Sequence, residues 1–347
     1  MKTSYHVKAG ALALALVLLF ISAWEFYWRS QGFKISYNDD ESLWTSTRKG
    51  VYDTSPLQPV IIGSSRAKFD VNLETWKNLS GQKPVQLALV GTSPRPVLTD
   101  LGNDPNFNGT LLIDVTEFLF FSKDGSPMEG EAKKRLDYYP KWSYSQQISF
   151  VLNNLLENVF VFLDINRFTL NSLLKRLPIE SRPGVFVFPN FPLETSETHF
   201  DRQEVFSDGF VADTAVQHGV QNVWSSLGMT SDKNVAVSGD TLTDIITNVR
   251  KSVDKIKSRG GKVLFVRMPS SDPVWATEQK VFPRKQYWDR LLKETGSEGI
   301  HFADYPELAK YSCPDWSHLS PSDAQTFTAE LIKIIEKKTD WKVQKTI

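Results

Sequence analysis

The stretch Val60-Ile-Ile-Gly-Ser-Ser-Arg66 decides the fold of this chain. Three apolar residues followed by a glycine predict a short buried strand that ends at Gly63 and presents a serine just beyond it. About 250 residues later, Asp315-Trp-Ser-His318 places a carboxylate and an imidazole three residues apart. A serine hydroxyl becomes a good nucleophile when a base removes its proton and a third group orients that base. The two segments together contain all three groups.

Short apolar runs along the chain predict the strands of a parallel sheet. They cover Pro59–Gly63, Val85–Val90, Thr110–Val115, Lys262–Met268 and, more weakly, Gly299–Ala303. Nearly continuous apolar runs are typical of strands buried on both faces. Thr241–Arg259 has apolar residues at helical spacing, and a second helix is predicted to begin after the N-cap residue Ser320. Strands that alternate with helices predict a doubly wound α/β fold.

The amino-terminal 28 residues predict a membrane anchor. Lys2 and Lys8 precede the uncharged run Ala9–Trp24, and the aromatic residues up to Trp28 suit the membrane interface. A cleaved signal peptide is the alternative, but Ile21-Ser-Ala23 is a poor cleavage site. Lysines before the span predict a cytoplasmic amino terminus, with the rest of the chain on the other side of the membrane.

Composition narrows the class of protein. The 347 residues include 40 Lys and Arg against 40 Asp and Glu, and this balance argues against a nucleic-acid partner. Cys313 is the single cysteine, so no intramolecular disulfide forms. His199 and His218 lack partners at metal-ligand spacing, and His301 is expected to be a strand residue. Neither a metal nor a cofactor is predicted.

The predicted organisation is an anchor over residues 1–28, a linker over 29–57 and one domain over 58–340 with an insertion at about 122–238. Within the insertion, Phe150–Leu174 is strongly apolar but is interrupted by polar residues. A buried core or a pair of cap helices is the favoured interpretation, and a surface that docks on the membrane or on a membrane partner is the alternative. Val185–Phe188 predicts a short strand.

Three polar segments are predicted to meet at one edge of the sheet. Gly63-Ser64-Ser65 follows the first strand, Gly91-Thr92-Ser93 follows the second, and Asp315 to His318 follows the fifth. Ligands of open α/β sheets bind beyond the carboxyl ends of the strands. Arg66 and Arg267 are weaker candidates for contact with an acidic substrate, and structural ion pairs are the alternative for both.

With these blocks in place, the chain resembles the SGNH (GDSL-like) hydrolases. It is most similar to the membrane-anchored branch that includes the alginate O-acetylation proteins and the D-alanyl transfer protein of teichoic acid. Ser65 matches the nucleophile of the family's Gly-Asp-Ser block, with Ser64 in place of the aspartate. Asp315 and His318 match its Asp-x-x-His block, and Gly91 matches the glycine of the second block. The third block, Gly-x-Asn, has no match, because Thr116-Glu-Phe stands after the third strand.

The resemblance implies a three-layer α/β/α fold with a parallel five-stranded, flavodoxin-like sheet. It also implies a membrane-anchored, extracytoplasmic O-acyltransferase, with acetyl as the expected group and a cell-envelope or exported glycan as the acceptor. The expected mechanism uses a Ser65–His318–Asp315 triad, with the backbone N–H groups of Ser65 and Gly91 as the oxyanion hole. A multi-spanning membrane acyltransferase is the expected partner, because it would deliver the acyl group across the membrane.

Three alternatives stay open at this point. One is a carbohydrate esterase or deacetylase of the same fold. The second is a catalytically inactive scaffold that binds polysaccharide or holds a membrane complex together. The third is that Ser65 only caps a helix and Asp315 is a turn residue.

Overall fold

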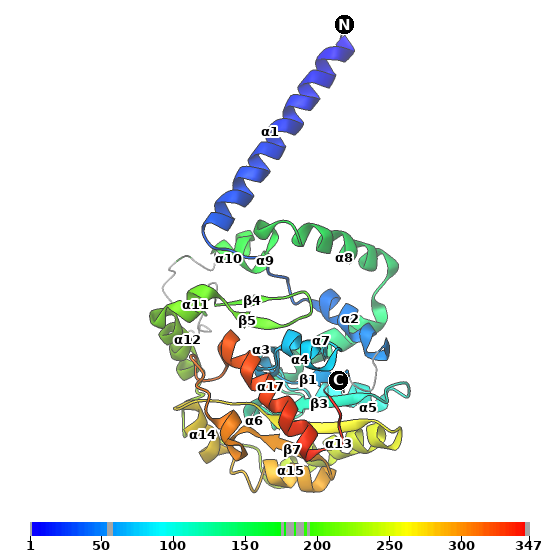
Figure 1. The fold of residues 1–347 in the computed structure, drawn as a ribbon, viewed down its shortest axis with the longest axis vertical. Coiled ribbons are helices and arrows are strands. Elements are labelled where there is room, and N and C mark those ends of the chain that lie inside the picture. The colour runs from blue at the N-terminus through cyan, green and yellow to red at the C-terminus, as the bar shows by residue number, and fades with distance from the viewer. Residues whose placement is uncertain are drawn as a thin grey trace. The chain divides into compact units, whose positions relative to one another are not determined.

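Five parallel strands form the sheet that positions the candidate site. They are β1 (Val60–Ile62), β2 (Val85–Gln86), β3 (Thr110–Asp114), β6 (Lys262–Arg267) and β7 (Glu298–His301), in the spatial order β2-β1-β3-β6-β7 (Figure 1). Every neighbouring pair in this sheet is parallel. The prediction of an α/β fold with a five-stranded parallel sheet is therefore confirmed, and each predicted apolar run overlaps one strand.

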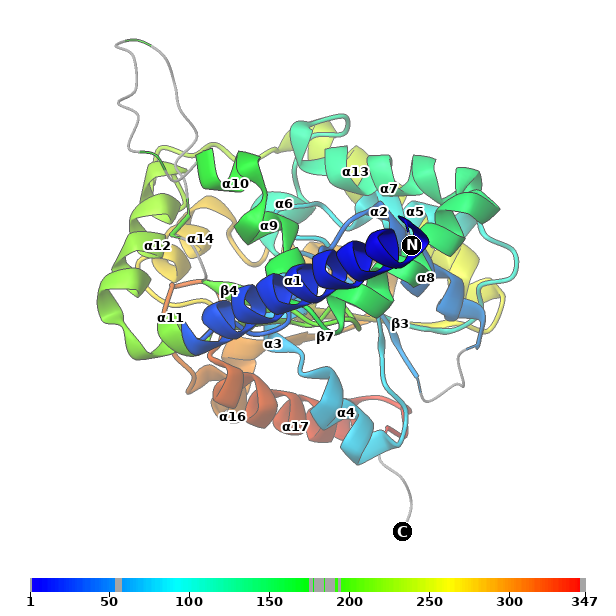
Figure 2. The ribbon, with the colours of Figure 1, turned by 90° about the horizontal axis from the view of Figure 1, so that it is seen from above.

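The strands are buried on both faces, as their continuous apolar sequences require. In β1, Val60 and Ile62 belong to one hydrophobic cluster and Ile61 to another. The first cluster contains residues of α5 (Arg95–Asn103) and α13 (Gly239–Ser258), and the second contains residues of α4 (Leu73–Ser80) and α17 (Pro321–Lys338). In Figure 2, α13 and α17 lie on opposite sides of the strands. Alternation of side chains along a strand explains this division, because successive side chains point to opposite faces.

The two predicted helices have the expected ends. Helix α13 covers the predicted segment at 241–259 to within two residues. Ser320 caps α17, its Oγ accepting a hydrogen bond from the N–H of Asp323 at 3.2 Å, with Pro321 as the first helical residue. This cap fixes where α17 starts, three residues after His318.

The computed structural model describes residues 2–53, 58–174, 177, 184, 191–192 and 195–343. The chain divides into two compact units, Met1–Asn38 with Tyr144–Phe186 and Asp39–Ser143 with Val187–Ile347. The second unit holds the sheet. The predicted insertion is thus divided between both units. The strand predicted at 185–188 lies outside the described residues.

The unit that holds the sheet contains further helices and a small hairpin. The helices are α2 (Glu41–Lys49), η1 (Gly50–Asp53), α3 (Ser65–Asp70), α6 (Glu117–Phe120), η2 (Pro127–Glu129), α7 (Gly130–Tyr138), η3 (Tyr139–Lys141), α11 (Asp208–Ala212), α12 (Thr214–Ser226), α14 (Val274–Val281), α15 (Trp288–Thr295), η5 (Phe302–Asp304) and α16 (Pro306–Ala309). The antiparallel hairpin consists of β4 (Ser196–Thr198) and β5 (Glu204–Phe206). Helix α2 falls in the predicted linker, and its Trp44 is fully buried in the first hydrophobic cluster.

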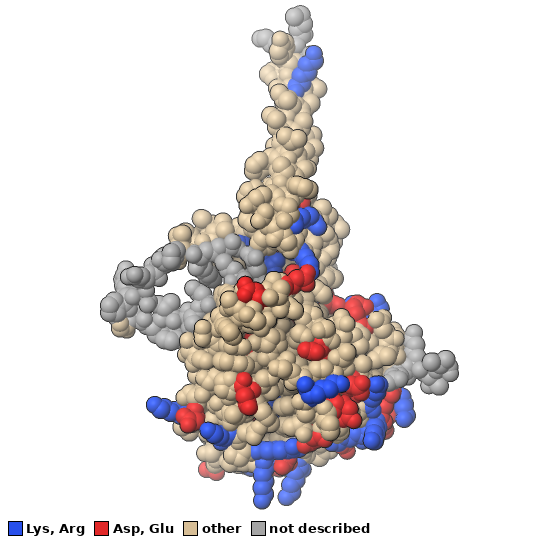
Figure 3. Space-filling model, turned by 60° about the vertical axis from the view of Figure 1, so that its left-hand side comes forward, with Lys and Arg blue, Asp and Glu red and all other residues tan. Residues whose placement is uncertain are grey.

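The other unit is built from the amino-terminal helix and the apolar part of the insertion. It contains α1 (Lys2–Ser30), α8 (Tyr144–Glu157), η4 (Val161–Leu163), α9 (Ile165–Phe168) and α10 (Leu170–Leu174). Tyr5–Ser30 is long and apolar enough to cross a membrane. In Figure 3 the surface of α1 is uncharged along most of its length.

The favoured interpretation of Phe150–Leu174 as a buried core is wrong for α8. None of its residues is buried by the part of the chain that the structure describes. Its apolar side chains face outward.

Candidate active site

The three predicted catalytic groups lie within hydrogen-bond distance of one another. His318 Nε2 is 2.8 Å from Ser65 Oγ, and His318 Nδ1 is 2.7 Å from Asp315 Oδ2. Ser65 is the first residue of α3, directly after β1, whereas Asp315 and His318 lie in the loop between α16 and α17. The sheet therefore brings together residues 253 positions apart in the sequence. With Nδ1 protonated, Nε2 is free to accept the serine proton.

Glycine is required at the turn that presents the serine. A Cβ on Gly63 would lie 2.5 Å from the Cβ of Asp114 and 2.8 Å from the Cβ of Ala67. Such distances are far inside van der Waals contact, so any side chain would push β1 away from β3 and α3. The absent side chain lets the strand and the helix meet closely enough to direct Ser65 toward His318.

Asp114 holds the residue before the nucleophile. Its Oδ2 accepts hydrogen bonds from Ser64 N at 3.0 Å and Ser64 Oγ at 2.8 Å, and a third from Thr116 Oγ1 at 3.2 Å. Burial raises the pKa of Asp114, although the two bonds from Ser64 oppose that shift. Sequence reasoning missed this role, because Asp114 ends an otherwise apolar strand where the family pattern has its third block. An acidic residue at the end of a buried strand was the available signal.

The loop that carries the base is held by Asp315. Its Oδ1 accepts hydrogen bonds from the backbone N–H groups of Ser317 at 2.9 Å and His318 at 2.8 Å. Trp316, between them, has a φ of 72°, which is uncommon for a non-glycine residue. Burial raises the pKa of Asp315, but His318 and these hydrogen bonds outweigh it, and the net pKa lies below its usual value. Asp315 is therefore ionised at neutral pH.

Three aromatic side chains lie around the imidazole of His318, one from α3 and two from the insertion. The ring centroid of Phe69 lies 4.5 Å from that of His318, and those of Trp224 and Phe206 lie at 6.0 and 6.1 Å. Trp224, from α12, also donates a hydrogen bond from Nε1 to Asp315 Oδ2 at 3.2 Å. Sequence reasoning identified neither Phe206 nor Trp224. No local pattern distinguishes them from other aromatic residues of the insertion.

The two predicted substrate-binding arginines are buried in one ion-pair network. Arg66 and Arg267 have side chains no more than 1% exposed, and both bind Glu278, Arg66 through Nη2 at 2.7 Å. Arg267 also pairs with Glu117 at 3.0 Å, and Arg66 Nε donates to Ser317 Oγ at 3.2 Å. This geometry gives both arginines the structural ion pair that was the alternative, and contact with a substrate stays a prediction. Burial raises the pKa of Glu278, but Arg267 and Arg66 outweigh it and lower the pKa to about 2.

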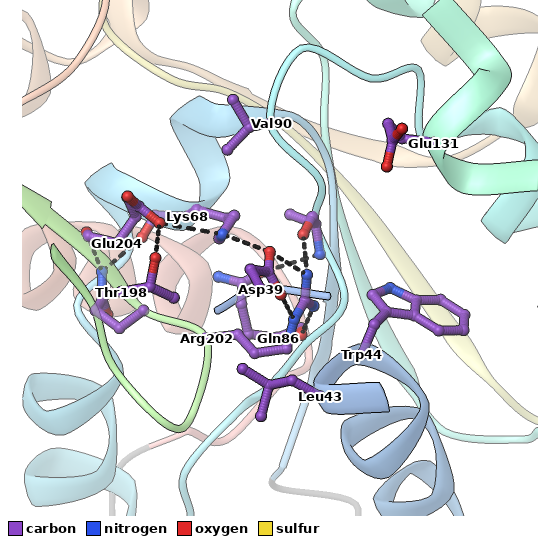
Figure 4. Close-up of polar contacts among 12 residues, drawn as sticks. Asp39, Leu43, Trp44, Lys68, Gln86, Val90, Glu131, Thr198, Arg202 and Glu204 are labelled. Carbon is purple, nitrogen blue, oxygen red and sulfur yellow. Dashed lines mark hydrogen bonds and ion pairs between the residues drawn. The ribbon is translucent and has the colours of Figure 1, made fainter. Parts of the chain in front are cut away.

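A second ionic cluster supports the nucleophile helix. Lys68, on α3, donates to Asp39 Oδ2 at 2.7 Å and to Glu204 Oε2 at 3.2 Å (Figure 4). Arg202 binds the same Asp39 at 2.6 Å and donates to the carbonyl of Ala88 at 2.9 Å. Burial opposes ionisation of Asp39, but the two cations lower its pKa below the ordinary value. The cluster thus ties α3 to the β4–β5 hairpin and to the start of this unit.

Asp70 is a fully buried carboxyl next to the loop that carries His318, and the charge of Arg66 only partly offsets its burial. Asp70 Oδ1 accepts a hydrogen bond from Leu319 N at 2.9 Å, and its Oδ2 has no hydrogen-bond partner among the described residues. Burial raises the pKa of Asp70 well above its usual value, and the charges of Asp114 and Asp315 add to the effect.

The predicted oxyanion donors, Ser65 and Gly91, both follow shortly after the carboxyl end of a strand of the sheet. Beyond β2 the chain continues beside β1, with Leu89 N donating to Gly63 O at 3.0 Å, and Gly91 follows two residues later. Gly91 has a φ of 62°, a conformation that favours glycine. The roles of the Ser65 and Gly91 N–H groups stay predictions.

His301 is the histidine that ends a strand of the sheet, as expected from the sequence. His301 ends β7, and burial, helped by Arg267 and Arg284, lowers its pKa to about 3. Within the described ranges of the chain, no group of three or more His, Cys, Asp or Glu side chains is arranged to hold a metal ion.

A hydroxyl, an imidazole and an ionised carboxylate in this order can carry out nucleophilic acyl transfer. Ser65 is only half-buried, so a substrate carbonyl has access to its hydroxyl. No protein-family model matches the chain, and no curated protein matches it.

Proposed function

We propose that this chain is a membrane-anchored, extracytoplasmic O-acyltransferase of the SGNH type that modifies a cell-envelope or exported glycan. The observation that carries the proposal is the continuous hydrogen-bonded line from Ser65 through His318 to Asp315. A serine that merely capped α3 would not require an imidazole at 2.8 Å or a carboxylate behind it. Acetyl is the expected acyl group.

The sheet topology supports the family assignment. The strand order corresponds to 2-1-3-4-5 of a flavodoxin-like sheet, and helices associated with both faces fit a three-layer α/β/α fold. In such sheets ligands bind at the switch point between the first and third strands. Ser65 follows β1 and Asp114 ends β3, which is the position that this rule gives for the site.

The proposed reaction has two halves. In the first, His318 Nε2 takes the proton from Ser65 Oγ as that oxygen attacks the acyl carbonyl, and the same proton then passes to the leaving group. In the second, His318 takes a proton from a glycan hydroxyl, whose oxygen attacks the carbonyl of the acyl-serine. The ester bond to Ser65 Oγ then breaks, and His318 returns the proton to that oxygen. Asp315 stays ionised throughout and stabilises the charged imidazole. Each oxyanion N–H is typically worth about 3 kcal/mol.

The nucleophile can be tested on the full chain in detergent. Ser65→Ala should abolish both labelling by a fluorophosphonate and hydrolysis of p-nitrophenyl acetate, and Ser64→Ala, the matched control, should retain both. Labelling that survives Ser65→Ala but is lost in Ser64→Ala would reverse the assignment. Absence of labelling in the unmodified chain would favour the inactive scaffold.

The acceptor separates the transferase from the esterase. With p-nitrophenyl acetate as donor, an oligosaccharide acceptor should become acetylated in preference to water. Release of all acetyl as free acetate, at any acceptor concentration, would favour the carbohydrate esterase.

The acyl group is proposed to come from a multi-spanning membrane acyltransferase. Acyl-CoA is made in the cytoplasm, whereas the apolar α1 with Lys2 and Lys8 before it predicts that the catalytic unit lies on the other side. The catalytic region alone should hydrolyse activated esters slowly and should acylate its glycan in cells only with that partner. Full cellular activity with a water-soluble donor would contradict the partner. A reporter fused after Arg29 that maps to the cytoplasm would contradict the topology.

A further inference from the structure

Helix α8 presents its apolar side outward. Its outward side chains recur at spacings of three and four residues and are between 51% and 86% exposed; they are Tyr144, Ile148, Val151, Leu152, Leu155 and Leu156. On the other side of the helix, Gln146, Asn154 and Glu157 are half-buried. A surface helix of a water-soluble domain has the opposite arrangement, with its apolar stripe toward the core.

A second apolar row continues beyond α8 in the same unit. Leu170, Leu173 and Leu174 of α10 and the following Leu177 are all more than 40% exposed. Spacings of three and four residues place Leu170, Leu173 and Leu174 on one side of α10. Large contiguous apolar surfaces of this kind mark interaction sites and not ordinary solvent-facing surface.

The segment that follows α8 is hydrogen-bonded to the end of α1. Arg29, near the end of α1, donates to the carbonyl of Val159 at 2.9 Å, two residues after α8. The carboxylate of Glu25 accepts the N–H of Val161 at 2.9 Å. Figure 1 shows α8 running crosswise to α1. A helix crosswise to a spanning helix runs along the membrane plane.

Aromatic residues mark the level at which α1 leaves the membrane. Trp28 has its ring centroid 5.0 Å from that of Tyr27 and 4.6 Å from that of Phe168 of α9. Trp and Tyr gather at the boundary between hydrocarbon and water. Because Trp28 packs against Phe168, α9 is held at the same level along α1 as these aromatic residues.

We propose that α8 is an interfacial helix whose apolar side lies in the lipid bilayer, at the outer end of α1. The inference rests on α1 crossing the membrane, as proposed above. The stripe is mostly aliphatic, and the segment after α8 is hydrogen-bonded to the end of α1. Lipid is the occupant, because the stripe has no buried pocket or charged pair that a specific protein contact would use. This absence concerns the described residues from Tyr144 to Leu156, among which no side chain is charged.

The lack of basic residues predicts how α8 binds lipid. Attachment through lysine and arginine needs anionic lipid and weakens with salt. Attachment through Leu152, Leu155 and their neighbours needs neither, because the driving force is burial of apolar surface at a depth of about 5–10 Å.

Single-cysteine fluorescence tests the proposal on the full-length chain. The natural Cys313 is only 2% exposed, so the unsubstituted chain serves as the labelling background. Leu152→Cys and Leu155→Cys, labelled with an environment-sensitive dye and reconstituted in phosphatidylcholine vesicles, should be quenched by lipids brominated near the headgroup. Asn153→Cys, an exposed position on the other side of the same helix, should not. Leu14→Cys in α1 should be quenched best by lipids brominated deep in the chain.

Each other outcome overturns the proposal in a recognisable way. Probes at 152 and 155 that bromolipids do not quench, together with a quenched probe at Leu14, would refute lipid as the occupant of α8 while the anchor stands. An apolar dye environment in that case would mean that a second copy covers α8, and a water-like one that nothing does. An unquenched Leu14 probe would remove the anchor itself and, with it, this inference and the topology of the proposed function. Quenching at 152 and 155 that requires anionic lipid or disappears in high salt would refute apolar insertion.

Discussion

Trp224 donates a hydrogen bond from its indole Nε1 to Oδ2 of Asp315, the same oxygen that accepts the Nδ1–H of His318. The indole is part of α12, in the insertion, whereas Asp315 belongs to the loop before α17. A residue of the insertion therefore helps to orient the carboxylate behind the base. In the proposed reaction Trp224 is a positioning residue, because it acts through Asp315.

Trp224→Phe should lower kcat for ester hydrolysis about 10- to 100-fold and leave KM nearly unchanged, because a hydrogen bond to a charged group contributes about 1.5–3 kcal/mol. The phenyl ring preserves most of the packing. Trp275→Phe is the matched control, since Trp275 stacks near His301 and does not touch the triad. Equal kcat in the two variants would show that the indole N–H has no part in positioning.

Ser64→Ala removes one of the donors to Asp114 and should reduce activity by no more than about tenfold, the effect of one neutral hydrogen bond. Asp114→Ala should reduce activity much more, because Ser64 N and Thr116 Oγ1 also lose their acceptor. Rates measured with thermal melting in parallel separate a loss of positioning from unfolding. Similar rates for the two variants would contradict the role assigned to Asp114.

Glu278→Gln should destabilise the fold strongly, because Arg66 and Arg267 would then face an uncharged amide in a buried site. Removing one partner of a buried pair typically costs about 3–5 kcal/mol. Asp304→Asn is the control, since its partner Arg284 is 43% exposed and such pairs contribute about 0–1 kcal/mol. Melting temperatures of both variants test the difference, and equal shifts would contradict the assignment of a buried network.

Asp70→Asn should stabilise the protein more at pH 8 than at pH 5. The pKa of Asp70 in the folded state is raised above its unfolded value of about 3.9. The contribution of Asp70 to stability is therefore full below the unfolded pKa and is lost as the pH rises through the folded pKa. Asparagine cannot lose a proton, so its advantage over aspartate should grow with pH. Thermal melting across this range measures that growth.

Asp39→Asn provides a control of opposite sign. The folded-state pKa of Asp39 is lowered, so its contribution to stability is full above the unfolded pKa and is lost as the pH falls. The variant should therefore be most destabilised at neutral pH and least at acidic pH. The same pH trend in both variants would mean that the two carboxyls are not in the charge environments described.

The sheet and the triad were predictable because their signals are local. Each strand is a continuous apolar run, and Gly63-Ser64-Ser65 and Asp315 to His318 have recognisable chemistry at strand ends and before a helix cap. The roles of Trp224 and Asp39 were not predictable, because their partners are distant in the sequence. Trp224 bonds to Asp315, which lies 91 residues away, and Asp39 bonds to Arg202, which lies 163 residues away. Helix α8 shows a further limit of periodicity. The pattern correctly indicates an apolar side, but it does not say whether that side faces protein or the outside.

The position of Asp39 sets where a water-soluble fragment can begin. A fragment that started at Gln58, the boundary suggested by composition, would lack the carboxylate shared by the buried Lys68 and Arg202 and would lack Trp44 from the hydrophobic cluster. Two cations would stay in the interior beside the helix that carries Ser65, and Lys68 would keep Glu204 as its carboxylate partner. A fragment cut anywhere between Gln31 and Asn38 keeps both residues. The last stretch before Asp39 is therefore where genetic or proteolytic removal of α1 should leave the candidate site intact.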